Sequence, residues 1–128
     1  GGLGGLWGKP VATVYIRPQR YTLDFVERED CFTLSFFGEE YRKALALCGS
    51  KSGRDVDKVK ECGFTVAGAA CGAPYFEEAG LVLVCKKAYW QDMDPTHFLD
   101  GELDGKWYPE RDYHRIFIGE IVEVLKKN

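Results

Sequence analysis

The chain has 128 residues, enough for one domain with a buried core, and its composition is that of a globular protein and not of a disordered segment. A net charge of −3 provides no general basic field, so we expect no binding to nucleic acid or to an anionic membrane surface. The longest apolar run, residues 81–85, is far shorter than the about 20 residues of a membrane-spanning helix, and no signal peptide precedes it. We therefore expect a cytoplasmic protein.

The first half of the chain predicts two strands separated by a short helix. Residues 11–16 are rich in β-branched side chains and predict a strand. Thr22 is a favourable N-cap residue, and the sequence after it predicts a helix through residue 29. Residues 31–37 alternate between apolar and polar side chains, as a half-buried strand does.

Two short helices are expected next, over residues 41–48 and 55–62, each followed by a glycine. Residues 81–90 and 114–125 predict long strands, with residues 75–77 as a short partner of the first. This order of elements indicates a mainly β fold with short helices. We expect an antiparallel, closed or partly closed small barrel in place of a doubly wound α/β fold.

Between the two long strands lies a segment, residues 91–112, that is long for a loop and contains Trp107 next to Tyr108. Segments of this length usually have a function of their own. The two aromatic side chains either cover a ligand or pack in the core or against a second copy of the chain. We favour packing.

The cysteines number five, an odd count, and no two of them are closer than nine positions. This excludes the C-x-x-C spacing of redox motifs and of zinc sites. We therefore expect all five to be reduced, most of them acting as small buried hydrophobes, and we expect no metal site.

Two segments have features of an anion site. Arg17 and Arg20 stand just before the helix that Thr22 caps, so guanidinium groups, a hydroxyl and free backbone N–H groups would converge as a phosphate monoester requires. The alternative is a solvated turn with an ordinary cap. In the second segment, Ser52 precedes Asp55 in the manner of a capping box, a weaker signal that lacks the spacing of a Walker A loop.

His114 shares a face with Glu120 and several apolar side chains if residues 114–125 form a straight strand. Titratable groups on an apolar face need partners, so His114 is either a satisfied structural histidine or a residue that faces a ligand. His97 lies in the long segment and is expected at the surface. Because no nucleophile elbow, H-E-x-x-H or paired-acid motif is present, redox chemistry would require a cofactor.

Four segments of the chain resemble the flavoredoxin branch of the flavin reductase-like family, in the family's order. They are residues 7–22, 32–37, 48–55 and 112–121. The resemblance implies an FMN-binding split β-barrel, usually a homodimer with the flavin near the subunit interface. It also implies that residues 1–128 form a single domain that lacks an N-terminal strand of its relatives, with residues 1–7 as the remnant of a wall beside the flavin ring.

The resemblance further assigns candidate site residues. His114 matches a histidine beside the flavin or the nicotinamide, and is the candidate catalytic residue. The residues that match cofactor-binding stretches of the family are Trp7, Arg17, Gln19, Arg20, Tyr21, Thr22, Ser50, Lys51, Ser52, Gly53, Arg54 and Asp55.

The function implied is hydride transfer from NADH or NADPH to bound FMN, followed by electron delivery to free flavin or to a partner protein. The sequence does not distinguish the two nicotinamides or name the final acceptor. A non-catalytic FMN-binding electron carrier is the alternative. A small barrel that binds oligonucleotides through its aromatic residues is disfavoured by the acidic charge balance.

Overall fold

The computed structural model describes residues 1–18, 27–43, 66–68, 71 and 73–127. A short 3-10 helix, η1 (Glu39–Tyr41), lies where the helix over residues 41–48 is expected to begin. The rest of that helix lies outside the described residues. So do the helix predicted after Thr22, except for its last turn, and the helix predicted over residues 55–62.

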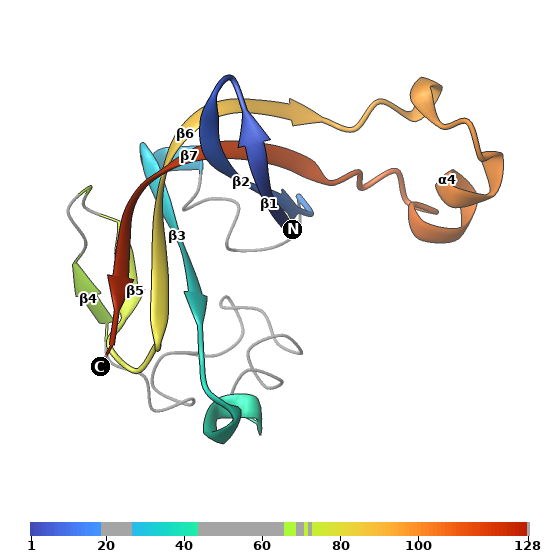
Figure 1. Ribbon diagram of the computed structural model, residues 1–128. Coiled ribbons are helices and arrows are strands. Elements are labelled where there is room, and N and C mark those ends of the chain that lie inside the picture. The colour runs from blue at the N-terminus through green and yellow to red at the C-terminus, as the bar shows by residue number, and fades with distance from the viewer. Residues whose placement is uncertain (19–26, 44–65, 69–70, 72, 128) are drawn as a thin grey trace.

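One antiparallel sheet forms the body of the molecule, and its strands are consecutive in space but not in sequence (Figure 1). In spatial order the five strands are β1 (Gly2–Leu6), β2 (Lys9–Ile16), β7 (Arg115–Lys126), β6 (Leu81–Asp92) and β3 (Cys31–Phe36). The strands predicted from alternation and β-branched composition are confirmed as β2, β3, β6 and β7, each within one or two residues of its expected bounds.

The sheet curls so that its two edge strands approach each other without pairing. A cavity of about 300 Å³ is lined by residues of β1 and β2 on one side and of β3 on the other. The concave face holds a cluster of buried side chains, so the curl encloses a hydrophobic core. The members of this cluster are Ala12, Phe32, Leu83, Cys85 and Phe117. The fold is therefore an antiparallel barrel left open between β1 and β3, which confirms the predicted class, a closed or partly closed small barrel.

Gly119 of β7 lies inside this core at a point that has no room for a side chain. A Cβ atom there would come within 2.8 Å of the Phe32 ring and 3.0 Å of the Cys85 Cβ. The glycine therefore leaves room over β7 for the Phe32 ring of β3 and the Cys85 side chain of β6.

The strand β1 was not expected from the sequence. Three of its five residues are glycine, which has low β propensity, yet it pairs with β2 from Gly2 opposite Thr13 to Leu6 opposite Lys9. The two-residue turn between them has positive φ at both Trp7 and Gly8, as tight hairpins prefer. The backbone pairing, not the side chains, defines this strand.

A second, two-stranded sheet packs on the convex side of the lower part of the barrel. It consists of β4 (Val66–Gly68) and β5 (Pro74–Phe76). The prediction that residues 75–77 pair with the strand that begins at Leu81 is wrong, because both edges of that strand, β6, are already occupied by β3 and β7. Tyr75 instead packs against a small cluster of Ala79, Val82 and Val84.

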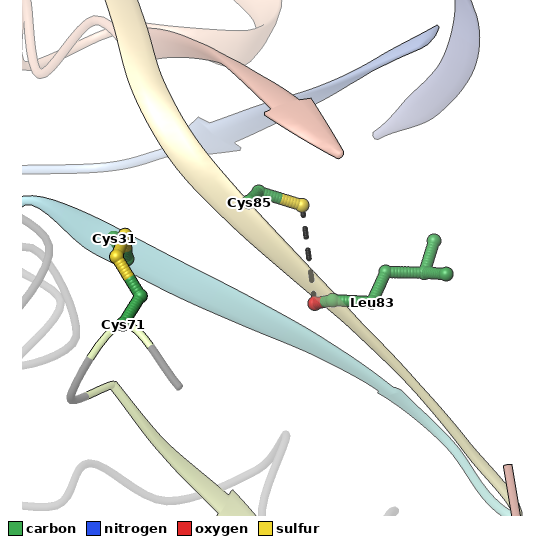
Figure 2. The surroundings of a disulfide bond; sticks show 4 residues. All are labelled: Cys31, Cys71, Leu83 and Cys85. Carbon is green, nitrogen blue, oxygen red and sulfur yellow. Dashed lines mark hydrogen bonds between the residues drawn. A yellow bond between two sulfur atoms is a disulfide. The ribbon is translucent and has the colours of Figure 1, made fainter. Parts of the chain in front are cut away.

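A disulfide bond between Cys31 and Cys71 ties this small sheet to β3 (Figure 2). The two Cα atoms are 6.1 Å apart, and nearby the Thr33 hydroxyl donates a hydrogen bond of 2.8 Å to the carbonyl of Pro74. The prediction that all five cysteines are reduced is therefore wrong for this pair. Their sequence separation of 40 matches no redox or zinc motif, and only the packing of β5 beside β3 brings them together.

At Cys85 the prediction of a reduced, buried cysteine is confirmed. It is a free thiol buried in the core, 0% exposed. Burial raises the pKa of the Cys85 thiol to about 11, because the thiolate would lose its hydration. At neutral pH this residue therefore acts as a small hydrophobe.

The long segment between β6 and β7 forms an arm that projects away from the barrel (Figure 1). It contains a short 3-10 helix, η2 (Pro95–His97), and the helix α4 (Gly101–Trp107). Asp94 and Asp100 cap the two helices, each side chain accepting a hydrogen bond from a backbone N–H of the first turn. None of the helices in the described part of the chain has the length and hydrophobicity to span a bilayer.

Candidate functional site

The end of β2 meets the returning end of the arm through Arg17. Its guanidinium group donates two hydrogen bonds, one of 2.8 Å to Asp112 Oδ2 and one of 2.9 Å to the carbonyl oxygen of Trp107. The same group lies over the ring of Tyr108, 5.0 Å from the ring centre. A single arginine side chain thus contacts three points on the arm.

His114 lies beside this contact, one residue before β7 begins. Its Nδ1 is 2.5 Å from the Tyr108 hydroxyl, and its backbone carbonyl accepts a hydrogen bond from the Met93 N–H. Partial burial lowers the pKa of His114, and the positive charge of Arg17 lowers it further, while Asp112 raises it. The imidazole is therefore neutral at pH 7.

Glu120, which the sequence placed on the same face as His114, is not its partner. The Glu120 carboxylate instead lies 3.5 Å from the Lys9 ammonium on the neighbouring strand β2. His97 is at the surface, as expected, with its side chain 74% exposed and 3.6 Å from Asp94.

Aromatic rings fill the base of the arm. Tyr108 is 8% exposed and its ring centre lies 4.8 Å from that of Tyr113 and 6.0 Å from that of Phe98. The Tyr113 hydroxyl donates to Asp104, and this hydrogen bond together with burial raises the pKa of Tyr113. Tyr108 thus packs within its own chain, as we favoured, whereas the neighbouring Trp107 is 54% exposed.

The cavity between the sheet edges is the other candidate ligand site. It is mainly apolar, and the residues that line it include Leu3, Val14, Leu34 and Phe36, with Thr13, Ser35 and the first two glycines. A volume of about 300 Å³ with few polar groups is typical of sites for small organic ligands.

The structure brings together two of the predicted site residues, Arg17 and His114. It does not bring Trp7 to them. Trp7 lies in the β1–β2 turn, 55% exposed, at the opposite end of β2, and a strand of that length separates its ends by roughly 25 Å. The remaining predicted site residues, from Gln19 to Thr22 and from Ser50 to Asp55, lie outside the described residues.

Tyr108 and Asp112 are the site residues that sequence reasoning missed. Arg17 and Asp112 are 95 positions apart, so no local spacing could have linked them. Among the described residues there is no group of three or more histidine, cysteine, aspartate or glutamate side chains placed to bind a metal ion.

The open antiparallel barrel, with a cavity between its edge strands and short helices around it, defines the split-barrel class of fold. The sequence model of the flavin reductase like domain matches residues 8–128. The chain therefore belongs to the flavin reductase-like family. No curated protein sequence is significantly similar to it.

Several solved structures share the fold. An FMN-binding protein from Thermus thermophilus is 24% identical over 98% of this chain, with a TM-score of 0.71. Flavoredoxin of Desulfovibrio vulgaris is 22% identical over 93% of the chain, with a TM-score of 0.70. Nitrilotriacetate monooxygenase component B from Bacillus cereus is 12% identical over 99% of the chain, with a TM-score of 0.74. The chain spans 61%, 54% and 59% of the length of these three proteins, respectively.

Proposed function

We propose that this chain binds FMN and acts as an oxidoreductase, taking electrons from NADH or NADPH through the bound flavin and passing them to free flavin or to a partner protein. The match of residues 8–128 to the flavin reductase like domain is the observation that carries the proposal. FMN supplies the hydride-accepting chemistry that no amino-acid side chain has. The protein's part is to bind and orient it.

The residues of the described structure fit a flavin. The cavity between β1, β2 and β3 offers a mainly apolar slot, which suits a flat aromatic ring. The two predicted phosphate-binding segments, residues 19–22 and 50–55, come after β2 and β3 in the chain, and both strands contribute residues to this cavity. We therefore assign the ring to the cavity and the phosphate to those segments.

His114 is the candidate catalytic residue. Its lowered pKa means that it offers a neutral imidazole at physiological pH, able to donate a hydrogen bond to the flavin or the nicotinamide without adding a positive charge. Its ring is fixed on one side by the Tyr108 hydroxyl.

We further propose that the protein works as a homodimer in the cytoplasm. Large apolar side chains lie exposed on the strands of the main sheet, and a second copy of the chain would bury them. They are Tyr15, Tyr89, Val122 and Val124. The mass of the purified protein from light scattering gives the oligomeric state directly.

The deciding experiment is a visible spectrum of the purified chain, recorded after FMN is added and unbound flavin is removed by desalting. We expect flavin absorption to remain with the protein and to bleach under anaerobic conditions when NADH or NADPH is added. Retention without bleaching would favour the non-catalytic carrier. If the flavin is lost both from this chain and from one extended at its N-terminus, the proposed function is wrong.

The phosphate assignment has its own test. Arg20→Ala combined with Thr22→Ala removes a positive charge and a hydroxyl from the predicted phosphate site, and we expect FMN affinity to fall at least about tenfold, the loss of one or two charge-assisted hydrogen bonds. Flavin fluorescence titration measures the affinity, and circular dichroism checks the fold. The exposed Arg42→Ala variant is the control. Equal affinity of the double variant and wild type would remove the phosphate site from these residues.

A further inference from the structure

We propose that Arg17 is a positioning residue and not a ligand of the FMN phosphate: it clamps the arm onto the end of β2 and, through Tyr108, orients the His114 ring. The sequence and the family resemblance both place Arg17 among the phosphate-binding residues, so this reassigns it. The role of His114 in catalysis rests on the proposed function, whereas the clamp itself is a property of the free protein.

Both terminal nitrogens of Arg17 already have acceptors within the chain. Its two terminal nitrogens donate to Asp112 and to the Trp107 carbonyl, and its side chain is only 24% exposed. A phosphate dianion brought to this guanidinium would also meet the carboxylate of Asp112, which lies 2.8 Å from it. Like-charge repulsion would offset the attraction, so a free arginine elsewhere is a better phosphate ligand.

Tyr108 transmits the position of Arg17 to His114. One face of its ring lies under the guanidinium group at 5.0 Å, and the edge of the ring meets the His114 ring at 5.5 Å with an interplanar angle of 84°. Its hydroxyl is 2.5 Å from His114 Nδ1 and 3.3 Å from the Met93 sulfur. Since an imidazole nitrogen is a far better acceptor than a thioether, we assign the phenol proton to Nδ1, which places the imidazole hydrogen on Nε2.

The charges that face His114 make the clamp measurable. They are Arg17, just after β2, and Asp112 at the end of the arm, and the Tyr108 hydroxyl contacts the imidazole directly. Arg17 lowers the pKa of His114 and Asp112 raises it. Removing Arg17 takes away its lowering effect while the raising effect of Asp112 remains, so we expect the pKa of His114 to rise.

The test is Arg17→Met in the full chain, which keeps an unbranched side chain without its charge. An NMR titration of the two histidines follows His114 in the protein without flavin, and His97, whose side chain is exposed beside Asp94, is the internal reference. We expect the pKa of His114 to rise, that of His97 to stay constant, and the FMN dissociation constant to change by less than about threefold. Arg42→Met is the matched control, since that residue is exposed and far from the arm in sequence.

Two results would overturn the proposal: an unchanged pKa of His114, or a loss of FMN affinity of tenfold or more. If Arg17→Met does not fold, Arg17→Lys separates the two roles, because lysine keeps the charge that a phosphate needs but cannot donate in a fork to Asp112 and the Trp107 carbonyl together. Because lysine also keeps the charge that lowers the pKa of His114, the readout for this variant is the imidazole tautomer, followed by the ¹⁵N chemical shifts of the ring. The clamp predicts that His114 loses its fixed Nε2–H tautomer with FMN affinity retained, and a phosphate ligand predicts an unchanged tautomer. If wild type itself binds no FMN, the proposed function fails while the titration still decides the clamp.

Discussion

Phe117→Ala is expected to lower the free energy of unfolding by about 3–5 kcal/mol, because Phe117 is the largest fully buried side chain in the described part of the barrel. Phe117 is 2% exposed, and its ring fills the concave face of β7 between Ala12 and Phe32. Truncation removes the apolar surface that the ring buries and leaves a cavity that the sheet cannot close, because the strands on both sides are held by their backbone pairing.

Phe36→Ala is the matched control, since the same change of side chain occurs at a site that is 46% exposed on the edge strand β3. There we expect a loss of less than about 1.5 kcal/mol, in proportion to the smaller area that Phe36 buries. Guanidinium denaturation followed by circular dichroism gives both values. Similar losses for the two variants would mean that the concave face is not the core of the barrel.

The strands that were predicted correctly are those in which the order of apolar and polar side chains reflects which faces of the strand are buried. Residues 31–37 alternate in polarity, and residues 81–85 form an apolar run because β6 is covered on both faces in its first half. β1 lacked such a signal, since its glycines carry no side chain and the pairing with β2 is purely backbone. The partner of β5 was missed for a different reason: adjacency in sequence suggested β6, whose edges were already taken.

Only those residues of the candidate site that stand out from their neighbours in the sequence could be predicted. Arg17 and His114 were singled out from their neighbours in sequence, and the structure brings them together. What each does depends on residues far along the chain. Asp112 accepts a hydrogen bond from the guanidinium that the sequence assigned to a phosphate, and the partner of His114, which the sequence left open, is Tyr108.

The match to the family and the environment of each residue support different parts of the assignment. Family membership follows from the match across residues 8–128. The choice of His114 over His97 follows from burial and contacts: the first is held at the junction of arm and sheet, and the second lies exposed near Asp94. Fold alone would not separate the two, because unrelated chemistries share folds.

Loss of the disulfide is expected to lower the free energy of unfolding by about 2–4 kcal/mol, because the bond between Cys31 and Cys71 closes a long loop and restricts the unfolded chain. Cys71→Ser is the suitable variant, since Cys71 is exposed and serine there buries no hydroxyl, whereas Cys31 is 2% exposed. Peptide mapping without reduction should find the two cysteines in one linked species, and guanidinium denaturation measures the stability.

A reductant distinguishes the effect of the disulfide bond on stability from the effect of replacing the Cys71 side chain. With dithiothreitol present, wild type and Cys71→Ser should unfold at nearly the same denaturant concentration, because the loop is open in both. Without it, wild type should be more stable, and the difference should vanish again if Cys31 is also replaced in both proteins. A gap in stability that persists in reductant would assign the effect to packing around Cys71. Equal stability without reductant, together with free thiols at both positions, would mean that β4 and β5 are held to β3 by contacts such as the hydrogen bond from Thr33 to Pro74 alone.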